Sequence, residues 1–309
     1  MNVVETRNLT RRYRDQLALD NVTLSLAANR IYGLLGRNGA GKTTLMSILT
    51  AQAFASSGDV RIFGATPFEN EQVLSRLCFV RESQKYPDDF TIRNALDAAA
   101  LFFPNWDKDL AEVLLADFQL PAPKKHRIKK LSRGQLSAVG VIIGLASRAE
   151  LTFFDEPYLG LDAVARQLFY DRLLTDFADH PRTIILSSHL IDEVANLLEH
   201  VIVIDHGRII MDDEVDAVTG SAFAVAGSAA AVERFVGERP ILHRDSLGAL
   251  SSVTVDSPLT ADDRELARTL GLELAPVSLQ QLIVRRTLKA NEEPGFRDEI
   301  DNTDLEVLR

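Results

Sequence analysis

The sequence has very little cysteine and no long apolar run. Cys78 is the only cysteine among 309 residues, so an internal disulfide and a cysteine-based metal site are both excluded. The six histidines are scattered and show no spacing typical of metal ligands. The longest apolar runs, such as residues 139–146, are far too short to span a bilayer. We therefore expect neither a disulfide-stabilised nor a membrane-spanning protein.

The chain lacks an excess of positive charge, because 44 Asp and Glu residues outnumber 34 Lys and Arg residues. The formal net charge is −10, so we expect no broad nucleic-acid-binding surface and no nucleic-acid partner. Arg7, Arg11, Arg12 and Arg14 interrupt the N-terminal segment, so we expect no signal peptide. Hydrophobic residues make up 46% of the chain and charged residues 25%, which is typical of a soluble globular protein. These features predict a cytoplasmic location.

The most informative segment is a glycine-rich stretch that matches the phosphate-binding pattern G-x-x-x-x-G-K-[ST] at every required position. It reads Gly36, Arg37, Asn38, Gly39, Ala40, Gly41, Lys42, Thr43, Thr44. An apolar run of strand type precedes it at residues 31–35, and a run of helical type follows at 45–49. An ordinary glycine-rich turn before a helix is the alternative, but the match and its context favour a phosphate loop.

This loop predicts a nucleoside triphosphate as ligand. Glycines let backbone N–H groups curl around the phosphates, and the helix N-terminus adds a partial positive charge. We expect Lys42 to reach the β- and γ-phosphates and Thr43 to bind Mg²⁺. ATP and Mg²⁺ are the expected cofactors, although the loop alone does not separate kinases, GTPases and ATPases.

Helices alternate with apolar strands along most of the chain, which predicts an α/β fold with a mostly parallel core sheet. Residues 1–30 are typical of antiparallel strands, and residues 91–120 are rich in helix. The character changes near residue 221. We predict three regions: an ATP-binding domain, a small α+β domain and an acidic, disordered tail, at residues 1–218, 219–289 and 290–309.

Further motifs follow the phosphate loop in a fixed order. Residues 131–135 read Leu-Ser-Arg-Gly-Gln and open a helix, Asp155 and Glu156 end an apolar strand, and His189 ends another. In this order the motifs resemble those of the ATP-binding cassette (ABC) ATPases, over residues 1–218. The resemblance implies a P-loop NTPase fold with a core sheet, an antiparallel β subdomain and a helical subdomain.

The resemblance also implies roles for single residues. Asp155 would hold Mg²⁺, Glu156 would polarise the attacking water, and His189 would contact the γ-phosphate. The signature residues Ser132, Gly134 and Gln135 would face ATP held by a second subunit. On the residues alone, Ser132 and Gln135 also fit a helix-capping box, and the Asp-Glu pair fits a solvated strand end.

Three further assignments depend mostly on the resemblance. Asp162 resembles the aspartate of the D-loop, and Tyr13 has the position of an aromatic that stacks on adenine. For Tyr13 the alternative is an ordinary surface tyrosine. Glu82 and Gln84 compete for the Q-loop position. Strand register favours Glu82, whereas we favour Gln84, as a catalytic residue and metal ligand, because a neutral amide can serve both Mg²⁺ and water.

The resemblance finally implies partners. The family works as a dimer, so we expect a second ABC ATPase subunit, identical or not, and an integral-membrane permease that places the chain peripherally on the inner face of the cell membrane. The small C-terminal domain resembles those of multidrug and antibiotic exporters. We expect Tyr86, Phe90 and Trp106 to be accessible to the permease and Phe102 to be helix core. The alternatives are an ABC ATPase acting on ribosomes or DNA and a regulatory nucleotide-binding module.

Overall fold

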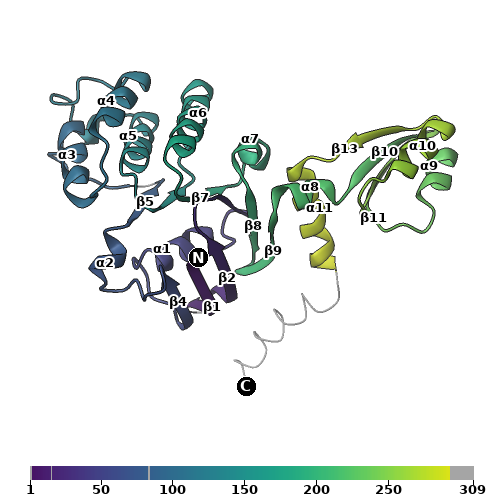
Figure 1. Ribbon diagram of the computed structural model, residues 1–309, viewed down its shortest axis with the longest axis horizontal. Coiled ribbons are helices and arrows are strands. Elements are labelled where there is room, and N and C mark those ends of the chain that lie inside the picture. The colour runs from purple at the N-terminus through teal and green to yellow at the C-terminus, as the bar shows by residue number, and fades with distance from the viewer. Residues whose placement is uncertain (1, 15, 83, 293–309) are drawn as a thin grey trace. The chain divides into compact units, whose positions relative to one another are not determined.

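The protein is described by a computed structural model that covers residues 2–14, 16–82 and 84–292 (Figure 1). It divides into two compact units. Among the described residues, the first contains 2–189 and 197–211, and the second contains 190–196 and 212–292. Most of the predicted acidic tail, residues 293–309, lies outside the described residues.

A six-stranded sheet forms the centre of the first unit, in the order β5-β6-β7-β3-β8-β9. The neighbours from β5 to β8 pair in parallel, which confirms the predicted α/β fold. β6 and β7 are buried at every position, as is typical of parallel strands covered on both faces. The strands are β3 (Ile31–Leu35), β5 (Leu77–Arg81), β6 (Leu151–Asp155), β7 (Thr183–Ser188), β8 (His200–Asp205) and β9 (Arg208–Glu214).

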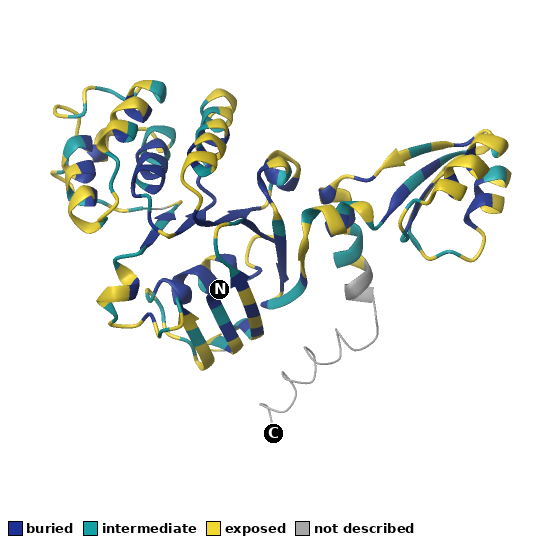
Figure 2. Cartoon of the chain, in the orientation of Figure 1, coloured by how far each residue is buried: buried dark blue, intermediate teal, exposed yellow. Residues whose placement is uncertain are grey.

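A second, antiparallel sheet in this unit has the order β2-β1-β4. Its strands are β1 (Asn2–Tyr13), β2 (Gln16–Ala27) and β4 (Ser57–Ile62). Buried and exposed positions largely alternate along β2, as expected for a sheet with one solvated face. Leu9 and Leu19 from this sheet share one apolar core with α1 (Lys42–Leu49) and with Phe153 of β6. Figure 2 shows this buried interior in dark blue.

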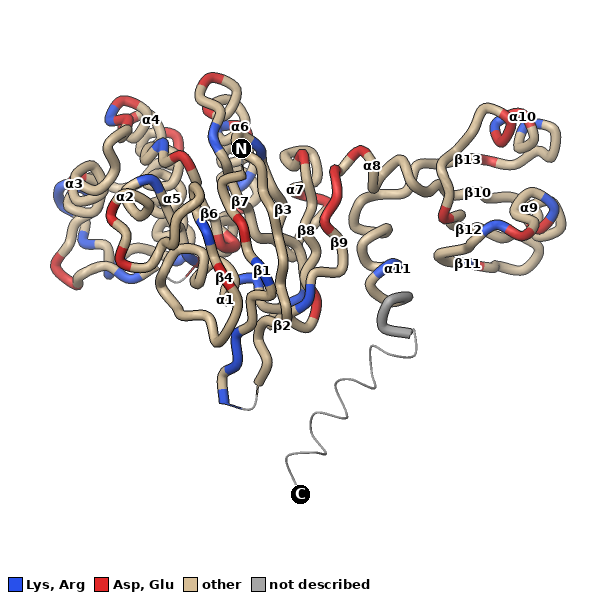
Figure 3. The backbone as a smooth tube through the Cα atoms, turned by 60° about the horizontal axis from the view of Figure 1, so that its bottom comes forward, with Lys and Arg blue, Asp and Glu red and all other residues tan. Residues whose placement is uncertain are grey.

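Helices of the first unit lie beside the parallel sheet. Ser132 begins α5 with a capping box, and Thr91 begins α3 in the same way. Charged residues of both signs lie along α3, α4 and α6 (Figure 3), and Arg93 of α3 pairs with Glu112 of α4 at 2.6 Å. The helices are α2 (Glu71–Leu74), α3 (Ile92–Phe102), α4 (Lys108–Asp117), α5 (Arg133–Ala146) and α6 (Ala163–Asp179).

The second unit contains a four-stranded antiparallel sheet in the order β11-β12-β10-β13. Phe223, Val225 and Phe235 form part of its own apolar core, which agrees with the α+β character predicted for this region. The strands are β10 (Phe223–Ser228), β11 (Ile241–Leu247), β12 (Leu250–Val255) and β13 (Glu273–Pro276). The helices are α7 (Ile191–Val194), α8 (Val215–Gly220), α9 (Ala229–Val236), α10 (Ala261–Leu270) and α11 (Leu279–Glu292).

Candidate nucleotide site

The glycine loop connects the end of β3 to the start of α1, in the strand-loop-helix context that the sequence predicted. Gly41 has a left-handed φ of 114°, and a Cβ added there would lie only 2.6 Å from the carbonyl oxygen of Ala18. A side chain at this position would therefore strain the backbone and clash with β2. Because Gly41 precedes the first turn of α1, its conformation turns the chain so that the helix N-terminus faces the loop.

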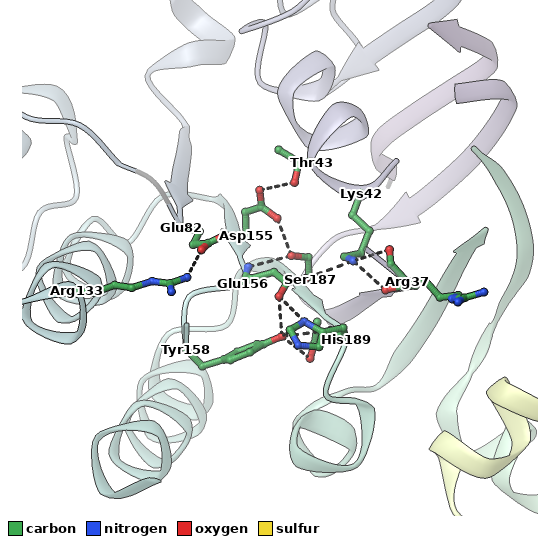
Figure 4. A network of polar contacts seen from close by, with 12 residues as sticks. Arg37, Lys42, Thr43, Glu82, Arg133, Asp155, Glu156, Tyr158, Ser187 and His189 are labelled. Atoms are coloured by element: carbon green, nitrogen blue, oxygen red, sulfur yellow. Dashed lines mark hydrogen bonds and ion pairs between the residues drawn. The ribbon is translucent and has the colours of Figure 1, made fainter. Parts of the chain in front are cut away.

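Lys42 is buried and its ammonium group is held by the loop itself. Nζ donates hydrogen bonds to the carbonyl oxygens of Gly36 and Arg37, at 2.8 and 3.2 Å. It also lies 3.3 Å from Oε1 of Glu156 (Figure 4). The lysine is thus fixed between the glycine loop and the end of β6, where it would meet the terminal phosphates of a bound nucleotide.

Sheet register places the first carboxylate. Asp155 is the last residue of β6 and pairs with Ser187 of β7, whose hydroxyl donates to Oδ1 at 2.8 Å. The hydroxyl of Thr43 donates to the other oxygen, Oδ2, at 2.8 Å. Burial raises the pKa of the Asp155 carboxyl above its ordinary value, and these two hydrogen bonds act in the opposite direction. Asp155 and Thr43 therefore present oxygen ligands side by side.

The second carboxylate belongs to Glu156, which follows β6 and points toward His189 and Tyr158. Glu156 has a φ of 48°, and its backbone N–H donates to Oγ of Ser187 at 2.9 Å. Its Oε2 lies 2.5 Å from Nδ1 of His189 and 3.2 Å from the hydroxyl of Tyr158. Figure 4 shows Glu156, Tyr158 and His189 converging on one point beside Lys42. The loop, the two carboxylates and the histidine form one connected polar network.

The signature segment begins α5 close to this network. Ser132 and Gln135 form the helix-capping box that their spacing also predicted. Arg133 pairs with Glu82, which follows β5 directly. A Cβ at Gly134 would lie 2.4 Å from the carbonyl oxygen of Gly160, so this glycine permits close packing inside the chain. Asp162 caps α6, since its Oδ1 accepts the N–H of Ala165 at 2.8 Å.

A cavity of about 690 Å³ lies over the loop. It brings together ten of the predicted site residues: Tyr13, Asn38, Gly39, Gly41, Lys42, Thr43, Thr44, Asp155, Glu156, His189. Tyr13 is 43% exposed there and the guanidinium of Arg11 lies 4.2 Å from its ring centroid. Ser132, Gly134, Gln135 and Asp162 are not among the lining residues.

Gln84 is not brought to this cavity. Glu82 lines it instead, while Gln84 lines a second, more apolar cavity of about 220 Å³. Tyr86, Phe90 and Phe102 line that second cavity too. The expectation that Phe102 is helix core is wrong, because its side chain is 73% exposed at the end of α3.

Three residues of the site carry no functional signal in the sequence: Ser187, Tyr158 and the side chain of Arg133. Ser187 touches Asp155 only because the register of β6 and β7 aligns them. Tyr158 lies two residues beyond Glu156, where no pattern gives a tyrosine a function. The side chain of Arg133 lines the cavity, although the resemblance implies no role for it.

The fold and this site define a P-loop ATPase. The ABC transporter family profile matches residues 19–159. The chain is 31% identical to the bacitracin transport ATP-binding protein BcrA of Bacillus licheniformis over 216 residues, which cover 69% of this chain and 70% of that protein. It is 28% identical to the Nod factor export ATP-binding protein I of Burkholderia orbicola over 255 residues, 81% of this chain and 82% of the other.

Solved structures agree on the fold. An ATP-binding subunit of an ABC transporter superimposes with a TM-score of 0.63 at 23% identity, covering 70% of this chain and 91% of that one. A dimeric ATP-binding cassette bound to ADP and phosphate gives a TM-score of 0.60 at 20% identity, covering 69% and 98%. The chain belongs to the ABC transporter ATP-binding proteins, and it is an ATPase subunit of that family. Each described helix is too short or too polar to traverse a bilayer.

Proposed function

We propose that this chain binds ATP with Mg²⁺ in the 690 Å³ cavity and hydrolyses it to drive export through a separate membrane permease. The observation that carries this proposal is the convergence of Lys42, the Thr43–Asp155 pair and the Glu156–His189 pair on that one cavity. Phosphoryl transfer to water needs a cation for the terminal phosphate, oxygen ligands for a divalent metal and a group that orients the water.

The donor set near Thr43 fits Mg²⁺. The ion usually takes one or two protein oxygen ligands and completes its shell with substrate phosphates and water. Thr43 Oγ1 and Asp155 Oδ2 lie 2.8 Å apart and both face the cavity. Among the described residues, no group of three or more His, Cys, Asp or Glu side chains forms a complete metal cage. When bound, Mg²⁺ would neutralise phosphate charge.

Each protein group then has a defined task. Lys42 would bind the β- and γ-phosphates through its ammonium group, which the glycine loop already positions. Glu156 would accept a proton from the attacking water, because its carboxylate borders the cavity. His189 would contact the γ-phosphate. Glu82 borders the cavity where Gln84 does not, so we assign the Q-loop position to Glu82 in place of Gln84.

The chain has one phosphate loop and one signature segment, so we propose that it works with a second ABC ATPase subunit. Ser132, Gly134, Gln135 and Asp162 would then complete the partner's nucleotide site. Export is supported by relatives named for bacitracin transport and for Nod factor export. The second cavity, with Tyr86 and Phe90 in its lining, would receive the permease and hold the chain at the membrane. We propose residues 1–218 as the ATP-binding domain and 219–289 as the small domain, whereas the compact units group residues 190–196 and 212–218 with the second.

The test is phosphate release with and without Mg²⁺, for the wild type and for Glu156→Gln. We expect Mg²⁺-dependent turnover in the wild type and ATP binding without turnover in the variant. Glu150→Gln is the control, because Glu150 pairs with Arg76 away from the cavity. Co-purification of the full chain from native membranes with a polytopic protein that raises its turnover would support export. Purification with ribosomes or DNA would contradict it.

A further inference from the structure

The hydroxyl of Tyr158 has several polar contacts at the nucleotide site, and the proposed function leaves them unexplained. Tyr158 is 1% exposed and its oxygen lies 3.2 Å from Oε2 of Glu156, 3.1 Å from Oγ of Ser188 and 3.3 Å from Nδ1 of His189. The backbone N–H of His189 donates to the same oxygen at 3.2 Å. A tyrosine hydroxyl has one proton to donate, so these contacts restrict where that proton can go.

The chemistry of the partners assigns the protons. The Glu156 carboxylate only accepts, so the Tyr158 hydroxyl donates to Oε2. Nδ1 of His189 lies 2.5 Å from the same oxygen, which requires its proton on Nδ1 and leaves Nε2 as an acceptor in the neutral ring. Burial raises the pKa of the Tyr158 hydroxyl well above its usual range, so it remains a donor. One carboxylate oxygen therefore accepts from two side chains.

We propose that Tyr158 is a positioning residue for hydrolysis, which fixes the rotation of the Glu156 carboxylate and the orientation of the His189 ring. This rests on the proposed function of the site. Tyr158 is absent from the lining of the nucleotide cavity, so it acts through its two neighbours and not on the substrate. A general base accelerates the reaction fully only when it is correctly oriented, because a small misalignment steeply slows proton transfer.

The hydroxyl and the ring of Tyr158 have different roles, which a single substitution can separate. The ring fills space, with its centroid 6.0 Å from that of His189 and 5.8 Å from the guanidinium carbon of Arg166. Tyr158→Phe keeps this ring and removes only the hydroxyl. We expect kcat to fall about tenfold or more, with KM for ATP within about twofold of the wild type. A purely structural role would not separate the two constants in this way.

Tyr32→Phe is the matched control. Tyr32 is also buried, and its hydroxyl donates to the carbonyl oxygen of Ala27 at 3.0 Å, away from the network. We expect this variant to keep wild-type kcat. In ¹⁵N-histidine NMR, Tyr158→Phe should shift the Nδ1 signal of His189, because the Glu156 oxygen that accepts Nδ1–H loses its second donor. A kcat for Tyr158→Phe within twofold of the wild type, or a loss of ATP binding, would overturn the proposal.

Two further variants keep the proposal falsifiable. In a His189→Ala background the effect of Tyr158→Phe on kcat should shrink, since one of its two targets is gone. Equal effects in both backgrounds would count against it. If Tyr158→Phe does not fold, Ser188→Ala removes another contact of the same hydroxyl and should lower kcat in the same direction. Wild-type turnover in Glu156→Gln would sink the proposed function itself, whereas an inactive Glu156→Gln beside a fully active Tyr158→Phe would sink only the role of Tyr158.

Discussion

The ammonium group of Lys42 lies 3.3 Å from Oε1 of Glu156, and both side chains are almost fully buried. The loop that would bind phosphate and the carboxylate that would activate water are therefore linked by a direct ion pair. Removing one charge of a buried pair leaves the other charge uncompensated. The free-energy cost of that unpaired charge exceeds the net stabilisation that the pair provided. This contact makes the two halves of the site depend on each other.

Lys42→Ala should lower nucleotide affinity and turnover together. The variant removes the cation expected at the terminal phosphates, and loss of one such preorganised group typically costs about 10² to 10³ in rate. Phosphate release and a fluorescent ATP analogue would measure the two effects. Lys108→Ala, an exposed lysine at the start of α4, is the control and should behave as wild type. Wild-type hydrolysis in Lys42→Ala would refute the site.

Ser132→Arg should act across the dimer. A bulky cation at the start of α5 would obstruct the partner's γ-phosphate, while the phosphate loop of the same subunit remains intact. We expect an isolated subunit to bind ATP as the wild type does, and the rate of hydrolysis to fall at least tenfold. The variant also removes the capping hydroxyl, at a cost of about 1 kcal/mol. Ser132→Ala controls for that cost, and an equal loss in both variants would mean damage to the fold.

Cys78 should resist alkylation in the folded protein. Burial raises the pKa of its thiol to about 12, whereas an unperturbed thiol titrates near about 8.5. The thiolate is the reactive form, so at pH 8 the folded protein should react with iodoacetamide far more slowly than the protein unfolded in urea. Mass spectrometry counts the single label directly. Equal rates in the two states would show that β5 is accessible.

Tyr86→Ala or Phe90→Ala should weaken permease association by about 1–3 kcal/mol, the usual range for a buried aromatic anchor. Both side chains line the 220 Å³ cavity and neither lines the nucleotide cavity. Nucleotide affinity of the isolated subunit should change little. Leu101→Ala is the control, because Leu101 is exposed on α3 outside this cavity. Unchanged co-purification of both aromatic variants with the permease would rule out this docking site.

Much of the fold was predictable, because buried parallel strands and capped helices leave strong local patterns. Among the elements that escaped prediction are α2, β9, α8 and β11. β11 contains the polar run His243–Ser246 and is mostly exposed, since it lies at the edge of its sheet. A strand of this kind is defined by its backbone pairing with β12, and pairing between strands leaves no period in the sequence.

The site shows the same division. A local motif marks the glycine loop, so residues 36–44 could be named from the chain alone. Strand register after β5 pointed to Glu82, which lines the cavity, whereas Gln84 was preferred for the chemistry of its amide, which does not indicate where the chain turns. The contact of Ser187 with Asp155 depends on strand register, and the contact of Tyr158 with Glu156 depends on the direction of the tyrosine side chain. These are tertiary facts, and a single sequence does not encode them as a pattern.

The close approach of Gly134 to Gly160 has a mechanical consequence. Their backbones meet where even one methyl group would not fit, and the hydroxyl of Ser137 donates to the carbonyl oxygen of Leu159 at 2.6 Å beside them. The start of α5 and the loop before Asp162 are thereby packed directly against each other. In the proposed dimer, a displacement of either segment would therefore be transmitted to the other, so we expect the two motifs to engage and release together.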